Sequence, residues 1–434
     1  MNFTITSLRT TFFIFTLFIL FIFTFCSISR HLYIELKDIE EITLEPLDIE
    51  INRKYCGANK CKFLFPYVVE EQETQCNRHF ISLMQIAQRI DRIIVLPNVG
   101  GSSISSLKSF PFDFYYNLDE LSKRFPKVKF ILQKEFQKWA NELYNKPDTI
   151  HVSLRNSRSN PKYISQYDIP FIDKLLKKYR IGRFDLKLNN STIFKRINVG
   201  KNGRGSRQNR ENNDLKEFLS AELESNAEVM LITQNEIRGP LFERLTPMPY
   251  ARHIINTTSN LIKKLNPYIA IHWRMERGQI DLMSKCAEGL VTYLRNLTLT
   301  TGITNIYLAT DYPLAENNNN KSQSRTFHYI YEEHHIAMKI LNSSFNLNTW
   351  VSTHMLDYLK SYPAKEEQLQ IELEGTGIQG IFDKLILIQA DYFIGGPKGC
   401  CRFDSTYTNH VMETREELFK NNGSIKNIID RWEL

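Results

Sequence analysis

The feature that most constrains the fold of this sequence is the apolar run Tyr268–Trp273, which ends at Arg274. A short run of this kind predicts a strand that is buried on both faces, as in a parallel sheet. A similar run, Gln389–Gly396, is followed by the hydroxyl-rich segment Asp404–Thr408. Ligands of open α/β sheets bind beyond the carboxyl ends of the strands. An arginine there, with hydroxyl and helix-terminal N–H groups nearby, suits a diphosphate, and we therefore predict a sugar-nucleotide site.

Strand patterns alternate with helix patterns along the chain. Helices are expected at 77–90, 254–265, 286–297, 329–341, 378–389 and from Ser405 onward, and strands at 92–96, 128–132, 268–273, 305–310 and 391–395. This alternation predicts an α/β protein with mostly parallel sheets. A length of 434 residues suffices for two such domains. We expect an N-terminal domain at 55–246, with a disordered loop at 198–214, and a C-terminal domain at 247–434, with the site in the cleft between them.

The N-terminal segment differs from the rest of the chain. Residues Phe12–Phe25 are almost entirely Phe, Ile and Leu, Arg9 precedes them, and an acidic tract follows them. This arrangement predicts a signal anchor, with the bulk of the chain in the lumen of the Golgi or endoplasmic reticulum. We therefore expect a cytosolic tail (1–10), a transmembrane helix (11–29) and a stem (30–54). The open alternative is a signal peptide that is cleaved, which also leads into the secretory route.

Cysteine usage supports an oxidising compartment on either reading, because six of the seven cysteines lie outside the apolar segment. Cys56, Cys61 and Cys76 cluster where the folded region begins, and we expect disulfides that involve Cys56, Cys61 or Cys76. The adjacent residues Cys400 and Cys401 are not expected to bond to each other, so each has a distant partner or stays free. Asn-x-Ser/Thr sequons along the chain are also typical of a glycoprotein.

The charge of the chain excludes one broad class of function. The formal net charge is +7, and the basic residues are spread along the chain, so no nucleic-acid-binding surface is indicated. A modest positive charge suits an anionic substrate, although most surface lysines serve solubility. The hydrophobic share of 42% is that of a globular protein.

A transferase that acts on a nucleoside-diphosphate sugar must stabilise the charge that develops on the leaving phosphate. Many such enzymes use a metal ion held by Asp-x-Asp, and this sequence contains no Asp-x-Asp. A site without a metal relies on cationic side chains and backbone dipoles. Arg274 fits this role through its planar fork, and Ser405 and Thr406 fit the rest at a predicted helix start. The alternative for Arg274 is a structural salt bridge, but its polar neighbours His272 and Glu276 favour function.

Four short segments occur in the order His272–Glu276, Ala309–Asp311, Gln389–Gly395 and Ser405–Thr408. They resemble the strand ends and the hydroxyl-rich turn of the GDP-fucose protein O-fucosyltransferase family. Phe112–Asp119 extends this resemblance into the N-terminal half. The resemblance implies a GT-B-like fold of two Rossmann-like domains, with GDP-fucose as donor substrate and a protein or glycan hydroxyl as acceptor. It also implies inversion at the sugar carbon without a metal or any other cofactor.

The resemblance further implies roles for individual residues near the donor. Arg274 would bind the β-phosphate and assist the leaving group. Ser405, Thr406 and Tyr407 would hold the phosphates. Asp391 would lie near the guanine.

The remaining candidates belong to the N-terminal loop and to the pocket. Asn77 matches the asparagine of the family's N-terminal loop, and His272 would orient the pocket unless it is an ordinary core histidine. The glycine-rich loop that precedes this asparagine in animal members is replaced here by Glu70–Gln75, without glycine. Some members use a glutamate of this loop as general base. Glu73 lies one residue from that spacing and is our candidate, with Glu71 as its competitor.

Two alternatives to a fucosyltransferase stay open. The same fold can use another sugar nucleotide, or the chain can be a catalytically silent member that binds glycans. The loss of glycine from Glu70–Gln75 favours the silent member, whereas the retention of Arg274, Ser405 and Thr406 favours an enzyme.

Overall fold

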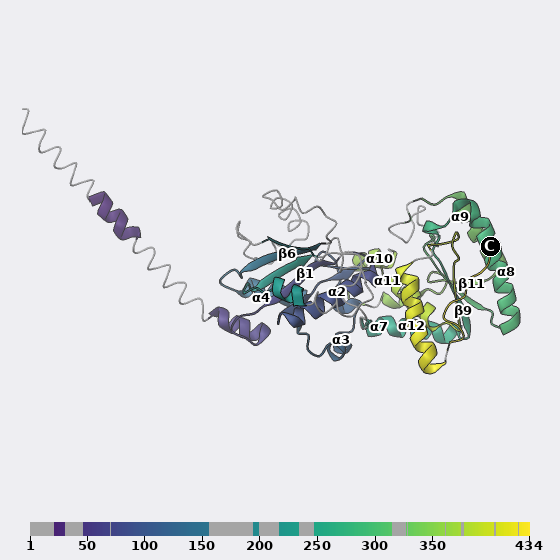
Figure 1. Ribbon diagram of the computed structural model, residues 1–434, viewed down its shortest axis with the longest axis horizontal. Helices are drawn as coiled ribbons and strands as arrows, with labels where there is room; N and C mark the ends of the chain where they lie inside the picture. The colour runs from purple at the N-terminus through teal and green to yellow at the C-terminus, as the bar shows by residue number, and fades with distance from the viewer. Residues whose placement is uncertain are drawn as a thin grey trace, which may run out of the picture.

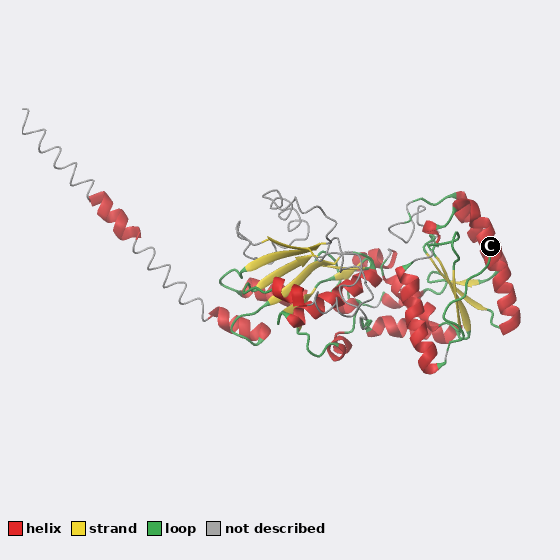
Figure 2. Cartoon of the chain, in the orientation of Figure 1, coloured by secondary structure: helices red, strands yellow, loops and turns green. Residues whose placement is uncertain are grey.

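The computed structural model describes residues 21–30, 47–69, 71–155, 194–198, 217–233, 247–314, 327, 329–360, 362–374, 377–402, 405–423 and 425–434. These residues form two α/β lobes that lie side by side along the long axis of the molecule (Figure 1). Strands occur in both lobes, with helices packed around them (Figure 2). The predicted α/β class is therefore confirmed, while the boundary proposed between residues 246 and 247 stays a prediction.

The N-terminal lobe is built on a mostly parallel sheet. Its strands run in the order β5-β2-β1-β8-β6-β7, and a short β3–β4 hairpin pairs antiparallel with the end of β1. The strands are β1 (Phe63–Val69), β2 (Ile93–Leu96), β3 (Val99–Gly100), β4 (Ser103–Ser105), β5 (Phe130–Leu132), β6 (Thr149–Arg155), β7 (Phe194–Asn198) and β8 (Val229–Thr233). The helices are α2 (Glu73–Arg89), η1 (Phe112–Phe114), α3 (Leu118–Arg124) and α4 (Gln133–Glu142), with further helices at 47–56 and 217–222.

Strand β1 lies in the middle of this sheet and is buried along its whole length. Phe63 and Phe65 point toward one core cluster with Trp139 of α4, and Leu64 belongs to another cluster with α2. Pro66 has no N–H to donate, and the pairing of β1 with β8 shifts register at this point, which is where a sheet tolerates proline. Burial on both faces explains why β1 is a continuous apolar run.

The C-terminal lobe contains a fully parallel sheet in the order β11-β10-β9-β12. The strands are β9 (Tyr268–Trp273), β10 (Asn305–Thr310), β11 (Leu347–Asn348) and β12 (Tyr392–Gly395). The helices are α7 (Arg252–Leu265), η5 (Met275–Arg277), η6 (Ile280–Leu282), α8 (Met283–Thr301), α9 (Glu332–Ser344), η7 (Met355–Leu359), α10 (Glu366–Glu374), α11 (Ile378–Gln389) and α12 (Thr406–Asn422). The predicted bounds of β9, β10 and α11 are confirmed.

Local sequence signals explain where the helices next to the site begin and end. Ser405 is the N-cap of α12, and its hydroxyl accepts a hydrogen bond from the N–H of Thr408 at 3.5 Å. Gly302 ends α8 in the left-handed conformation, with φ of 71°. Fully buried Arg415 of α12 donates to the last carbonyls of α11, including that of Ala390 at 2.7 Å. Helices α11 and α12 are therefore held together as one unit behind β9 and β12.

Two disulfides are present among the described cysteines. Cys56 pairs with Cys61, and Cys286 of α8 pairs with Cys400 in the loop after β12. The prediction of a disulfide at Cys56, Cys61 or Cys76 is confirmed, and Cys400 has the distant partner that was expected for one of the adjacent cysteines. Buried Cys76 is a free thiol.

The predicted membrane anchor falls largely outside the described residues. Residues 21–30 form an exposed apolar helix, and residues 11–20 are not described. Within the described parts of the chain, no helix is both long enough and apolar enough to cross a membrane. The low-complexity loop predicted at 198–214 also lies outside the described residues, except for Asn198 at the end of β7.

Candidate functional site

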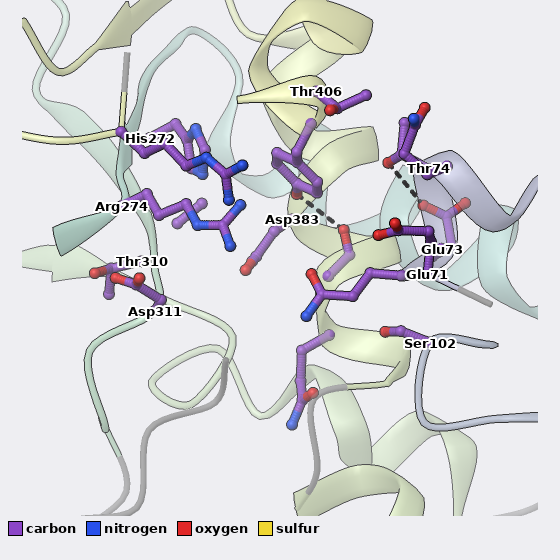
Figure 3. A pocket seen from close by; sticks show the side chains of 17 residues that line it. Glu71, Glu73, Thr74, Ser102, His272, Arg274, Thr310, Asp311, Asp383 and Thr406 are labelled. Atoms are coloured by element: carbon purple, nitrogen blue, oxygen red, sulfur yellow. Dashed lines mark hydrogen bonds between the residues drawn. The ribbon is translucent and has the colours of Figure 1, made fainter. Parts of the chain in front are cut away.

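A cavity of about 450 Å³ lies between the two lobes. The N-terminal lobe contributes residues 71–75, at the start of α2, and the β3–β4 turn, and the C-terminal lobe contributes the carboxyl ends of β9 and β10. The N-terminal turns of α11 and α12 complete the lining. Residues of the two lobes face one another across it (Figure 3). Strand ends and helix N-termini thus meet at one point, where anionic ligands of α/β proteins bind.

Arg274 follows the last residue of β9 and lines this cavity, with 15% of its side chain exposed. Its Nη2 lies 2.7 Å from Oε1 of Glu276, whose side chain is fully buried. Arg402 lines the cavity too, and its Nη1 lies 3.5 Å from the same oxygen. The guanidinium groups of Arg274 and Arg402 thus share the carboxylate of Glu276 at the cavity wall.

Asp311, at the carboxyl end of β10, fixes the turn that carries Arg274. Its Oδ1 accepts from the N–H of Met275 at 2.8 Å, and its Oδ2 accepts from the N–H of Glu276 at 3.2 Å. Burial raises the pKa of Asp311 to about 7, against the opposing effect of these N–H groups and of Arg274. The carboxylate therefore holds the backbone of Met275 and Glu276, the segment that follows Arg274 and carries its ion-pair partner.

His272 lies beside the N-terminus of α12. Its Nδ1 is 3.0 Å from Oγ1 of Thr408, and its ring centroid is 4.9 Å from that of Tyr407. Burial, and then the charge of Arg274, lower the pKa of His272 to about 3, so the ring is neutral. Thr406 and Tyr407 line the cavity, and the Tyr407 hydroxyl donates to the carbonyl of Gly380 at 2.9 Å.

Three predicted site residues do not line the cavity. Ser405 is buried and acts as the helix cap. Asn77 lies behind the loop, where its Nδ2 donates to Glu73 at 2.6 Å. Asp391 lies at the amino edge of the sheet, where its Oδ2 accepts from the N–H of Tyr268 at 3.0 Å. At about 3.3 Å per strand residue, this edge is roughly 20 Å from Arg274, so the structure does not bring Asp391 to the expected guanine side.

Asp383 is a cavity residue that the sequence analysis did not identify. It lies in the first turns of α11, and its Oδ1 accepts from the hydroxyl of Tyr307 at 2.6 Å. Burial raises the pKa of Asp383 to about 7. Asp383 and its neighbour Lys384 are the only charged residues of the mostly apolar helix Ile378–Gln389, and this was the signal that could have revealed them.

The two candidate bases differ in their surroundings. Glu73 is buried, and its carboxylate is occupied by Lys384 and by side-chain donors from its own lobe. Burial favours a higher pKa for Glu73, but Lys384 outweighs it and lowers the pKa below its usual value. Glu71 is exposed at the cavity, with φ of 86°, and the described part of the chain offers it no hydrogen-bond or ion-pair partner. Both line the cavity, but only the carboxylate of Glu71 is open to it.

Two α/β lobes that enclose a positively charged strand end and two helix N-termini are typical of transferases that act on nucleotide-linked substrates. The model of the family described as GDP-fucose protein O-fucosyltransferase matches residues 74–418. The chain belongs to this family and is a glycosyltransferase.

Several solved structures are similar to the chain at low identity. POFUT1 in complex with GDP-fucose has 14% identity and a TM-score of 0.44, over 86% of this chain and 98% of that chain. The NodZ alpha-1,6-fucosyltransferase co-crystallised with GDP has 14% identity and a TM-score of 0.39, over 81% and 92%. Fucosyltransferase NodZ from Bradyrhizobium has 13% identity and a TM-score of 0.37, also over 81% and 92%. No curated protein sequence matches the chain significantly.

Proposed function

We propose that the protein transfers fucose from GDP-fucose to a hydroxyl group of a protein or glycan acceptor, with inversion at the sugar carbon and without a metal ion. The observation that carries this proposal is the position of Arg274, at the end of β9 and facing a cavity that the N-terminus of α12 also lines. The departing GDP gains negative charge on its β-phosphate. Preorganised donors at this place stabilise that charge in the transition state.

The diphosphate is held by the C-terminal wall of the cavity. The planar fork of Arg274 makes paired bonds to phosphate oxygens, and Arg402 adds a second positive charge. The hydroxyl of Thr406 and the free N–H groups of the first turn of α12 bind the remaining oxygens. The sequence has no Asp-x-Asp, so these groups take the place of a metal ion in the proposed mechanism.

Asp383 is the best acceptor for the guanine. The Watson–Crick edge of guanine presents an N–H and an NH₂ group side by side, and one carboxylate accepts from both. Asp383 and neutral His272 line the same cavity. A bound guanine stabilises the ionised form of Asp383, so nucleotide binding lowers a pKa that burial has raised.

Glu71 is the proposed general base in place of Glu73. Its carboxylate is exposed on the N-terminal wall, opposite Arg274 (Figure 3). Inversion requires that the acceptor attacks from the face opposite the leaving group. A base and a leaving-group cation on opposite walls suit this single displacement.

The proposed location is the secretory pathway, with an N-terminal anchor and a luminal catalytic part. The apolar run Phe12–Phe25 and the two disulfides support it, because disulfides persist in oxidising compartments. Alkaline carbonate extraction is expected to leave the full-length protein in the membrane pellet. Complete release into the supernatant would contradict the anchor.

Calorimetric titration of the purified protein with GDP-fucose, GDP-mannose and UDP-sugars tests the donor. GDP-fucose is expected to bind at least tenfold more tightly than any UDP-sugar, and transfer of labelled fucose to an acceptor mixture is expected to survive EDTA. Tighter binding of another sugar nucleotide would favour a different donor. Absence of all binding would favour the silent, glycan-binding alternative.

A further inference from the structure

A buried ion pair joins the two lobes beside the cavity. Glu73 begins α2 in the N-terminal lobe, and Lys384 belongs to α11 in the C-terminal lobe, 311 positions further along the chain. Their side chains are 7% and 1% exposed. The pair therefore connects the loop that carries Glu71 to the helix that carries Asp383.

The carboxylate of Glu73 has no free acceptor position. Its Oε1 accepts from Nδ2 of Asn77 at 2.6 Å and from the hydroxyl of Tyr250 at 2.5 Å. Its Oε2 accepts from Oγ1 of Thr74 at 3.1 Å and from the ammonium group of Lys384. A carboxylate offers about four lone-pair sites, so this one is saturated. A carboxylate whose lone pairs are all occupied cannot take up the proton of the hydroxyl group of the acceptor substrate.

Lys384 is surrounded by aromatic groups as well as by its partner. Its Nζ lies 3.2 Å from the hydroxyl of Tyr250, 5.9 Å from the Tyr250 ring centroid and 5.5 Å from that of Tyr407. Removing two charges from water costs about as much as their attraction returns, so an apolar pair would stabilise the fold equally well. What the ion pair adds is directionality, because only one arrangement of α2 against α11 satisfies it.

We propose that Glu73 and Lys384 are positioning residues, which fix the start of α2 against α11 and thereby set the place of Glu71, two positions before Glu73, over the acceptor hydroxyl. Neither residue exchanges a proton with substrate. This inference rests on the proposed function, in which Glu71 is the base. A displacement of about 1 Å in such a group is enough to lower turnover about 10²-fold.

The test compares Lys384→Met, Glu73→Gln and the double variant in the full-length protein. Lys384→Met leaves a buried carboxylate without its cation, and it is expected to lower kcat about 10²-fold, with the Kd for GDP-fucose within about threefold of wild type. The double variant has no unpaired charge, and the amide oxygen introduced by Glu73→Gln still accepts from the hydroxyl of Tyr250. The kcat of this variant is expected to be at least about tenfold higher than that of Lys384→Met, and its Tm is expected to return most of the way to that of wild type.

Glu413→Gln is the matched control. Arg78 and Glu413 also join α2 to the C-terminal lobe, at 2.9 Å, but Glu413 is 62% exposed. Loss of this exposed pair is expected to change kcat by less than about twofold. An equal loss of kcat in Glu413→Gln and Lys384→Met would overturn the inference. The Glu73–Lys384 pair would then have no larger effect on turnover than an exposed contact between α2 and the C-terminal lobe.

The double variant decides between positioning and chemistry. If it folds, binds GDP-fucose normally and is as inactive as Lys384→Met, the charge of Glu73 or Lys384 acts on the substrate and the inference is wrong. If Lys384→Met does not fold, recovery of folding and transfer in the double variant supports the inference. If wild type binds no GDP-fucose, the proposed function fails. The positioning role is then tested by the Tm values of wild type, the two single variants and the double variant. Additive losses of Tm would show that Glu73 and Lys384 are not coupled and would refute the inference.

Discussion

The two walls of the cavity are built in different ways. The C-terminal wall consists of residues at the carboxyl ends of β9 and β10, of the first turns of α11 and α12, and of Arg402 in the loop after β12. The N-terminal wall consists of residues 71–75, which lead into the first turn of α2, and of the β3–β4 turn. The positive groups proposed to bind the donor thus lie on the C-terminal wall, where Arg274 directly follows a strand, whereas the proposed base Glu71 lies in the short segment before α2. Arg274, which is proposed to bind the donor, can be located from the local sequence pattern. The placement of Glu71, the proposed base for the acceptor, depends on contacts between distant parts of the chain.

The difference extends to how each wall is held in place. Asp311 fixes Arg274 through backbone N–H groups that are 36 and 35 positions away. The turn of the N-terminal wall is held from the other lobe, since the N–H of Gly101 donates to Oε2 of Glu372 at 2.7 Å and Oγ of Ser102 donates to the carbonyl of Gly377 at 2.9 Å. The acidic wall should therefore be sensitive to changes far from the cavity.

The sharpest test of the comparison is Glu71→Gln. Removal of a general base is expected to lower kcat about 10²–10⁴-fold, with the Kd for GDP-fucose unchanged, because the N-terminal wall does not hold the donor. Single-turnover transfer kinetics and calorimetry measure the two quantities. Near-normal kcat would remove Glu71 from the mechanism.

Substitution of Arg274 tests the opposite wall. Arg274→Ala is expected to lower kcat about 10²–10³-fold, which corresponds to about 3–4 kcal/mol of transition-state stabilisation, and also to weaken GDP binding. Arg274→Lys should recover little, because lysine cannot make the paired planar contact. Circular dichroism should show an intact fold. If Arg274→Lys were fully active, a point charge would suffice and the paired contact would be refuted.

Asp383→Asn should change base selectivity and pH dependence more than turnover. An amide cannot accept two guanine N–H groups, so preference for GDP over UDP is expected to fall about 10-fold or more. In wild type the affinity for GDP should weaken as the pH falls below about 7, because protonation removes the acceptor. Binding isotherms between pH 5 and 8 should show this loss of GDP affinity in wild type. The variant should show a smaller loss, because only Asp311 then still titrates near pH 7 at the cavity.

The same raised pKa predicts a stability effect of known sign. The folded state binds a proton on Asp383 more tightly than the unfolded state, so its contribution to stability is present at low pH and is lost as the pH rises to about 7. Wild type should therefore lose Tm relative to Asp383→Asn between pH 5 and 8 when no ligand is bound. A constant difference would show that Asp383 titrates normally.

The smallest effect on transfer is expected from the disulfides. The Cys286–Cys400 bond spans 114 positions, and its replacement by serines should lower the free energy of unfolding by about 4–5 kcal/mol in the chain-entropy limit. The Cys56–Cys61 bond spans 5 positions, and its loss should cost about 2 kcal/mol without changing kcat. Denaturant titration compares them. Equal losses would show that loop length does not govern their contribution.

Much of the C-terminal lobe could be predicted from sequence because its signals are local. Strands such as Tyr268–Trp273 are short apolar runs between clear helix patterns, and Ser405 marks the start of α12. Strand β1 is central to the other lobe, yet Pro66 interrupts its pattern, and only its register shift makes the proline acceptable. Its pairing with β8, more than 150 positions away, leaves no trace in either segment.

The position of a residue could be predicted where that residue directly follows its strand. It was mislocated where the residue precedes its strand and therefore lies at the opposite edge of the sheet. Arg274 follows β9, so its place at the carboxyl edge was apparent. Asp391 precedes β12 and therefore lies at the other edge, although both belong to matching segments. Glu71 and Glu73 could not be separated from spacing alone, because the partner that occupies Glu73 is contributed by α11.

The backbone at Glu71 has a consequence for how this protein can evolve. A φ of 86° is one that glycine adopts freely and that costs other residues about 1–2 kcal/mol. Selection for thermostability alone would therefore favour glycine at this position, and the carboxylate would be lost with the substitution. Stability and activity are opposed at this one residue, so libraries screened only for heat resistance should accumulate inactive Glu71→Gly clones.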